Sequence, residues 1–218
     1  NDGNFTYTPQ VNFAGNDTFT YKVVDPLNSE SQVVTVTINV IGLNDRPEAT
    51  FNVDQNTTED DPQGLDGILT YADDDVGDVI TFSLVGGAVD GFTLNVNNGV
   101  WSFDPSQASY QDLPQGGSRE VVIIYAVTDQ AGASDQESFT ITVSGSNDHP
   151  QATFDAQQNV NEGGGVLNGN LTGSDVDIGD GNNLVFADTT GGRDGLTINA
   201  DGSFTFNADH PAYDALAA

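Results

Sequence analysis

The sequence contains no cysteine and no methionine, and only four of its 218 residues are basic. Without thiols, the chain cannot form disulfides, zinc–thiolate sites or a cysteine nucleophile. Its formal net charge of −29 excludes nucleic acid and anionic membrane surfaces as partners, because both require a basic patch. There is also no run of about 18 apolar residues, so the sequence predicts no membrane-spanning helix.

The excess of carboxylates favours cations as ligands. An extracellular protein without disulfides also needs another source of rigidity. The chain opens without a secretory signal pattern and directly inside a strand-like alternation, so we expect it to be a segment of a longer protein. Segments rich in Val, Ile, Thr, Phe and Tyr recur between Gly, Asn and Asp turns, which indicates β-structure and not disorder.

A short motif marks two junctions in the chain. Asn44-Asp45-Arg46-Pro47 returns as Asn147-Asp148-His149-Pro150, a period of about 100 residues that is typical of tandem domains. Each copy follows one alternating apolar run and precedes another. Because proline donates no backbone hydrogen bond and favours extended geometry before it, each junction is predicted to be a short, stiff connector. The predicted domains are residues 1–43, 44–146 and 147–218.

The middle segment has the pattern of a complete domain. Seven short alternating runs separated by turn residues predict an immunoglobulin-like β-sandwich. A short helix is predicted from Pro105 to Leu113, with Asp104 as its N-cap. Trp101 is interpreted as a core residue. The predicted strands are Ala49–Val53, Gly67–Tyr71, Val79–Leu84, Phe92–Val96, Gly99–Phe103, Val121–Val127 and Glu137–Val143.

The outer segments are interpreted as partial copies of the same repeat. The first has strand patterns at residues 5–7, 19–24 and 33–41, and Tyr21 and Asp25 align with Tyr125 and Asp129. It is therefore the closing half of a domain. The third begins like the second but contains no counterpart of its last two strands. The predicted architecture is all-β, with tandem immunoglobulin/cadherin-like sandwiches, one complete repeat and two partial ones.

Acidic residues fall at both ends of the predicted sandwich, next to the two junctions. Carboxylates about 5 Å apart repel by roughly 0.8 kcal/mol even in water, so such clusters call for a counter-ion. All the donors are oxygens, which favours Ca²⁺ over Mg²⁺. The candidate ligands at the first joint are Asp17, Asn44, Asp45, Asp73, Asp75 and Asp129. Those at the second joint are Glu59, Glu120, Asn147, Asp148, Asp175 and Asp177. Asp17 is interpreted as the counterpart of Glu120 in the first segment.

Each of these motifs also has a structural interpretation. An isolated Asp-x-Asp-x-Gly is most often a solvated turn, and Asn-Asp-x-Pro is an Asx-turn before an extended segment. Asp78 and Asp180 fit a turn role as well as ligation. The repetition of the motifs, their position at the joints and the lack of basic partners favour calcium.

Several of these motifs resemble calcium motifs of known repeats. Asp73-x-Asp75-x-Gly77, Ser118-Arg119-Glu120, Thr128-Asp129 and Asn-Asp-x-Pro are similar to the calcium motifs of cadherin repeats, although Ser118 stands where cadherins carry Asp. The fuller resemblance is to bacterial cadherin-like repeats of the VCBS type, found in giant secreted (RTX-type) adhesins. It implies that these residues bind interdomain Ca²⁺ and stiffen the array, with one or two ions at each joint.

We therefore expect a calcium-rigidified extender, or stalk, of a secreted bacterial surface adhesin that supports adhesion and biofilm formation. Its partners would be neighbouring repeats of the same chain, with host or surface ligands bound by other domains. The alternative is a ligand-binding module for a sugar, peptide or protein, or a self-associating adhesion module. No nucleophile–base pair or histidine cluster is present, so no enzyme is predicted.

Overall fold

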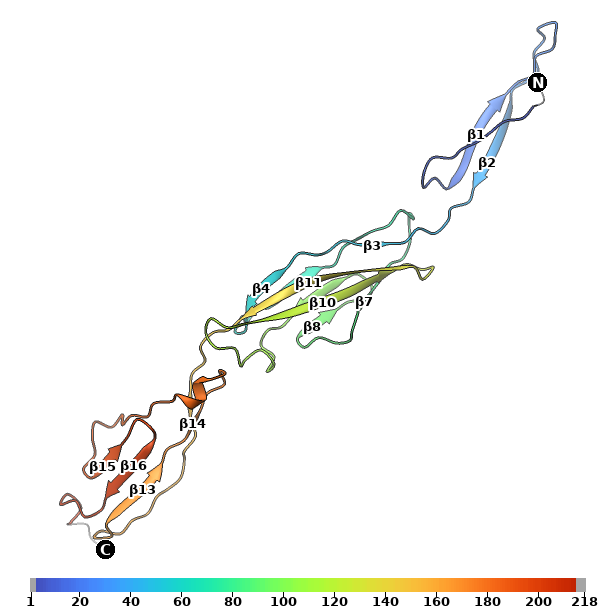
Figure 1. The fold of residues 1–218 in the computed structure, drawn as a ribbon. Coiled ribbons are helices and arrows are strands. Elements are labelled where there is room, and N and C mark those ends of the chain that lie inside the picture. The colour runs from blue at the N-terminus through green and yellow to red at the C-terminus, as the bar shows by residue number, and fades with distance from the viewer. Residues whose placement is uncertain (1–2, 215–218) are drawn as a thin grey trace.

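The computed structural model describes residues 3–214 as a row of three β-units, with the chain ends at opposite extremes (Figure 1). One short 3-10 turn, η1 (Asp180–Asn182), is the only helical element in this part of the chain. The all-β architecture of a complete sandwich between two partial ones is confirmed. No helix within the described range is long and apolar enough to cross a membrane.

The first unit is an antiparallel hairpin of β1 (Gly15–Tyr21) and β2 (Val34–Val40). Residues 5–7, predicted as a strand, have no strand neighbour within the described residues and form none. Phe5 instead packs edge-on against Phe19, with ring centroids 5.1 Å apart. Within residues 3–214 no second sheet covers the hairpin. Tyr21 and Val34 at one end of it are exposed, as are Val23, Val24 and Val33 beside it, whereas Phe19, Val36, Ile38 and Val40 are half-buried.

The second unit is a two-sheet sandwich with a small two-stranded ladder. One sheet has the order β4-β11-β10-β7, the other β5-β9-β8, and β3 pairs with β6. The strands are β3 (Glu48–Ala49), β4 (Gln55–Thr58), β5 (Leu65–Ile68), β6 (Tyr71–Ala72), β7 (Thr81–Leu84), β8 (Phe92–Leu94), β9 (Val100–Phe103), β10 (Ser118–Thr128) and β11 (Ser134–Ser144).

The core of the second unit lies between its two sheets. Trp101 is 2% exposed, which confirms its predicted core position, and its ring packs on Phe92 and Phe139. Tyr125 is fully buried, and its hydroxyl accepts from Phe51 N at 2.9 Å and donates to Phe51 O at 3.1 Å. This hydroxyl therefore ties the first segment of the sandwich to β10 at a point where Phe51 has no strand partner.

The helix predicted from Pro105 to Leu113 is wrong: these residues form successive turns. Asp104 still acts as a local cap, because its Oδ1 accepts from Ser106 N at 3.0 Å. Tyr110 and Leu113 are both buried in the core, which holds the backbone in this path. A segment bounded by Pro105 and Pro114 offers only about two turns, too few for a helix that must also satisfy those two anchors.

The third unit repeats the opening of the second. Its sheet β13-β16-β15 has the order of β5-β9-β8, and the ladder β12-β14 corresponds to β3-β6. The strands are β12 (Gln151–Ala152), β13 (Val166–Asn170), β14 (Gly173–Ser174), β15 (Leu196–Ile198) and β16 (Ser203–Asn207).

One glycine shows how closely the two units correspond. A Cβ on Gly67 would lie 2.7 Å from the Trp101 ring, and one on Gly169 would lie 2.5 Å from the Phe204 ring. Each sheet therefore seats an aromatic ring directly on a neighbouring strand, and only glycine leaves room for it.

Candidate metal centres at the joints between repeats

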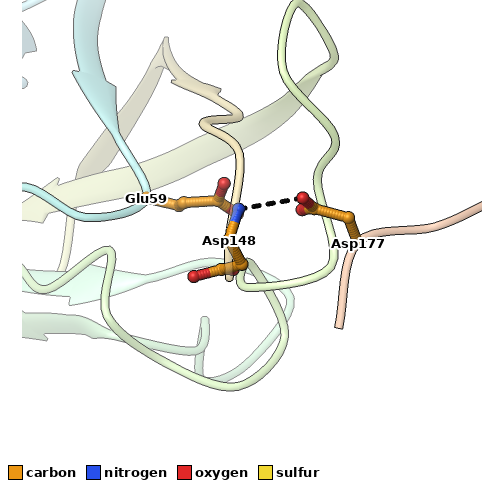
Figure 2. A group of neighbouring side chains, drawn as sticks. All are labelled: Glu59, Asp148 and Asp177. Carbon is orange, nitrogen blue, oxygen red and sulfur yellow. Dashed lines mark hydrogen bonds between the residues drawn. The ribbon is translucent and has the colours of Figure 1, made fainter. Parts of the chain in front are cut away.

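At the second joint, three carboxyl groups approach one another from three segments. Figure 2 shows Glu59, which follows β4, Asp148 of the connector and Asp177 of the third unit. One carboxylate oxygen from each lies within 4.8 Å of the other two. The backbone fixes this arrangement, because Asp148 N donates to Asp177 Oδ2 at 2.9 Å and Ser146 N donates to Glu59 Oε1 at 2.6 Å.

These acids are buried and only partly satisfied. Glu59 is 0% and Asp177 3% exposed. Asp148 Oδ2 and Asp177 Oδ1 are inaccessible to water and have no hydrogen-bond partner. Burial is the main cause that raises the pKa of Glu59 and that of Asp148, and neighbouring acids raise both further. Burial and mutual repulsion therefore make the ionised form of these carboxylates unfavourable, and binding of a cation or of protons would relieve this cost.

At the first joint, a second group gathers at the other end of the complete unit. Carboxylate oxygens of Asp73, Asp78 and Asp129 lie within 4.8 Å of one another. Asp129 is 5% exposed, and Asp73 Oδ2 is buried without a partner. Asn44 Nδ2 donates to Asp129 Oδ2 at 2.7 Å, which brings the connector against the group.

The pKa values of two acids at the first joint are shifted in opposite directions. Burial raises the pKa of Asp78, and the charges of Asp75, Asp73 and Asp129 add to the effect. The amide of Asn44, together with backbone donors of the following loop, lowers the pKa of Asp129. Asp129 therefore loses its proton more readily than Asp78 does.

The same backbone pattern occurs at both joints. Asp45 N donates to Asp75 Oδ2 at 2.6 Å, as Asp148 N does to Asp177. Asp75 N donates to Asp73 Oδ1 at 2.8 Å, and Asp177 N donates to Asp175 Oδ1 at 3.0 Å. These hydrogen bonds thus hold each Asn-Asp connector against the Asp-x-Asp turn of the domain that follows it.

Not every predicted ligand lies in these two groups. Asn147 Nδ2 donates to Asp148 O at 2.6 Å, and Asp175 is a charged neighbour of Asp148. Glu120 is exposed on β10. Asp17 is exposed, and its carboxylate accepts from Tyr7 Oη at 3.0 Å and from Thr18 N at 2.8 Å.

Strand register also changes the correspondence of Asp17. It lies opposite Ile38 in β1–β2, as Val121 lies opposite Ile141 in β10–β11. Counted from the aligned pair Tyr21 and Tyr125, Asp17 takes the position of Val121, not that of Glu120. Asp78, which the sequence left open between a turn and a ligand, belongs to the first group.

The residues of both groups fit a hard divalent cation. At 4.8 Å, each pair of charges repels by about 0.9 kcal/mol in water and about 3.5 kcal/mol at an effective dielectric constant of 20. The ion pairs of Lys22, Arg46 and Arg119 are with Glu30, Asp135 and Asp112, which lie outside both groups. Carboxylate oxygens are the ligands that Ca²⁺ prefers, and in both groups some of these oxygens are buried without a hydrogen-bond partner.

The two units also touch beside the second joint. Ile178 N donates to Asp112 O at 3.0 Å, which links the turn of the third unit to the 105–117 segment of the second. Asp112 is held in turn by Arg119, with 3.1 Å between Nη2 and Oδ1. A direct contact between the second and third units thus lies beside the acidic group of the second joint.

Comparison with known sequences gives one family. The profile described as "Bacterial Ig domain" matches residues 1–39. Domains of this kind usually occur in extracellular or surface proteins, and they are typically non-catalytic. No curated protein matches the chain.

Comparison with solved structures gives cadherin repeats. The human CDH23 EC21–23 structure matches with a TM-score of 0.54 at 16% identity, over 89% of this chain and 65% of that one. Drosophila N-cadherin EC1–4 matches with a TM-score of 0.50 at 17% identity, over 93% and 51%. The chain thus spans about two thirds of the first of these structures and about half of the second. At these identities the likeness shows the fold.

Proposed function

We propose that the chain is an extender segment of a bacterial surface adhesin, in which Ca²⁺ at the joints locks successive repeats into a stiff rod. Glu59, Asp148 and Asp177 would hold an ion at the second joint, and Asp73, Asp78 and Asp129 would hold one at the first. When bound, the ion would supply positive charge among these carboxylates. At the second joint the three acids come from the second unit, the connector and the third unit, whereas at the first joint all three come from the second unit and the connector meets them through Asn44. The partners in this function are the neighbouring repeats of the same chain.

One observation carries this proposal. Two groups of carboxylates have water-inaccessible oxygens without a hydrogen-bond partner, and both groups lie where a connector meets a repeat. Solvated surface turns would leave these oxygens in water. The cadherin-like fold and the bacterial Ig match support an extracellular role.

Small-angle scattering tests the mechanical claim. In millimolar CaCl₂ we expect one narrow distribution of distances with a constant maximum dimension. In a chelator, unscreened repulsion at the joints should broaden the distribution and lower the thermal midpoint, since an ion that binds only the folded array stabilises it by mass action. An unchanged scattering curve and midpoint would refute calcium stiffening.

Calorimetry with matched variants tests the sites. Asp148→Asn should weaken or remove one binding event at the second joint, and Asp129→Asn should do the same at the first. Asp66→Asn changes an exposed carboxylate on β5 that lies outside both groups, so it should leave the titration unchanged. Equal effects from all three substitutions would mean that calcium binds only as a diffuse counter-ion.

A further inference from the structure

The side of the complete unit carries a hollow of about 510 Å³, a size typical of small-molecule sites in proteins. It lies where β6 and the start of β7 meet the turn between β8 and β9. Leu69 and Phe82, which belong to the buried core, form its floor. All its lining residues fall between residues 68 and 98, so the hollow is formed by the complete unit alone.

Tyr71 forms an aromatic wall of this hollow. Its ring packs edge-on against Phe82, with ring centroids 5.9 Å apart, yet the residue is 43% exposed. The backbone of Tyr71 is held by its pairing with Ala49 in the β3–β6 ladder. Ile68 and Val79 also line the hollow and are exposed. An oriented aromatic ring and two aliphatic side chains are therefore accessible to a ligand at one place.

Two side-chain amides lie at the rim of the hollow, on the turn between β8 and β9. Asn95 holds this turn, because its Oδ1 accepts from Asn97 N at 3.0 Å and its carbonyl oxygen accepts from Gly99 N at 2.9 Å. Asn98 Oδ1 accepts from Val100 N at 3.1 Å, which orients the Asn98 amide. The turn is therefore fixed by its own hydrogen bonds, and both amides are positioned before any ligand binds.

One carboxylate completes the rim. Asp78 lines the hollow just before β7 and is half-buried. One of its carboxylate oxygens lies within 4.8 Å of oxygens of Asp73 and Asp129 in the acidic group of the first joint. The hollow is therefore adjacent to that group, and Asp78 belongs to both.

This combination of side chains matches the chemistry of a neutral saccharide. Sugar hydroxyls both donate and accept hydrogen bonds, and the amides of Asn97 and Asn98 also do both, whereas the Asp78 carboxylate accepts. The negative face of an aromatic ring attracts the partly positive C–H groups on the apolar face of a sugar ring. The net charge of −29 and the carboxylate at the rim disfavour an anionic ligand.

The main chain around the hollow is paired, which argues against a bound peptide strand. Leu69 N donates to Gly99 O at 2.9 Å, and Phe82 N donates to Val96 O at 2.8 Å. A peptide that extends a sheet needs free backbone groups along a strand edge. The groups that this hollow offers to a ligand are side chains, which favours a compact ligand that bonds through hydroxyls.

We propose that the hollow of the complete unit binds a neutral saccharide. Tyr71 packs on the apolar face of one sugar ring, and Asn97, Asn98 and Asp78 bond to its hydroxyls. This inference goes beyond the proposed stalk function and does not rest on it. A repeat with such a site would itself contact a glycan-bearing surface, in addition to spacing other domains.

The third unit has a hollow in the same place, which provides an internal control. Its volume is about 550 Å³, and Leu171 and Phe186 line it. Gly173 occupies the position in the β12–β14 ladder that Tyr71 occupies in β3–β6. The fold therefore forms this hollow in both units, but only the second unit supplies an aromatic ring at that position.

Two-dimensional NMR of the isotopically labelled chain in CaCl₂ tests the site. The probes are the methyl glycosides of glucose, galactose, mannose and N-acetylglucosamine, each added to tens of millimolar. We expect at least one of them to shift the side-chain amide signals of Asn97 and Asn98. The amides of Asn182 and Asn183, which line the hollow of the third unit, should not shift. Sialic acid, an anionic probe, should bind to neither hollow.

Variants of two lining residues test the contacts. Tyr71→Leu removes the aromatic ring but keeps an apolar side chain beside Phe82. Asn97→Ala removes an exposed amide, while Asn97 N keeps its bond to Asn95. Each should weaken binding by about tenfold, with folding checked by urea denaturation. Asn56→Ala removes an exposed amide on β4, outside the hollow, and should leave binding unchanged.

Three outcomes would overturn the site: no shift of the Asn97 and Asn98 amides with any of the four glycosides, equal shifts in the third unit, or unchanged affinity in both Tyr71→Leu and Asn97→Ala. The result is separable from the proposed function. Calcium stiffening without any saccharide shift would leave the stalk function standing and refute the site. Saccharide binding at Tyr71 in a chain that calcium does not stiffen would do the reverse.

Discussion

Replacing Asp177 by Asn should change stability in opposite directions with and without calcium. The amide is nearly isosteric with the carboxylate, and its oxygen can still accept from Asp148 N, at 2.9 Å in the native chain. The substitution removes one of three charges that lie within 4.8 Å of one another. In chelator it therefore removes repulsion, whereas in calcium it removes an anionic ligand.

The size of the effect follows from the geometry. Asp177 forms two repulsive pairs, with Glu59 and with Asp148, each costing at least about 0.9 kcal/mol in water and about 3.5 kcal/mol at an effective dielectric constant of 20. A proton on Glu59, which its raised pKa favours, would relieve some of this repulsion. In chelator we expect the second unit of the Asn variant to be more stable than that of the native chain by about 2 kcal/mol, the sum of the two pairs in water. A lower effective dielectric constant at the site would make the gain larger.

The assay can observe the second unit alone. Trp101 is the single tryptophan of the sequence and lies in the core of that unit. Urea denaturation followed by its fluorescence, in chelator and in millimolar CaCl₂, gives the two changes in stability. Asp66→Asn serves as the control for a charge lost at an exposed position. A variant less stable than the native chain in chelator, by as much as in calcium, would refute repulsion as the reason for the ion.

Two further outcomes follow from the same structure. Tyr125→Phe leaves the buried N–H and carbonyl of Phe51 without their partner, so the second unit should lose about 1–3 kcal/mol in urea denaturation; a loss near zero would mean that this tie is unimportant. Glu59 and Asp148 have raised pKa values in the folded chain, so these two groups bind more protons in the folded state than in the unfolded state. In chelator, the free energy of unfolding should therefore fall as the pH rises above the ordinary pKa values of these groups, 4.5 for Glu59 and 3.8 for Asp148. In calcium the trend from pH 5 to 7 should reverse, because protons compete with the ion; identical pH profiles in both buffers would contradict this competition.

Alternation predicted the strands that have one buried face. Trp101, Ile123 and Ile141 follow this pattern and lie in the core. β4 has no such signal: its sequence is Gln-Asn-Thr-Thr, and only Thr57 in it is buried. This strand exists because it pairs with β11, a tertiary partner that local propensity cannot indicate.

The candidate site was predictable to the extent that it repeats. The Asp-x-Asp turn and the Asn-Asp connector occur twice in the sequence, and the structure gives both the same hydrogen bonds. Glu59 was placed at the second joint from strand order, but its complete burial depends on the 105–117 segment, which folds as turns and not as the predicted helix. The place of Asp17 could have been counted from the sequence, because the alignment of Tyr21 with Tyr125 already puts it at Val121, and the strand register agrees with that count.

The parallel pairing of β4 and β11 determines how the repeat responds to a pulling force. The chain enters the complete unit beside β3 and leaves it at the opposite end after β11 (Figure 1). Tension between the two ends therefore draws β4 and β11 past each other along their length. The bonds between Gln55–Thr58 and Ile141–Ser144 then carry the load together and must rupture at once, whereas strands peeled apart from one end would break them one by one.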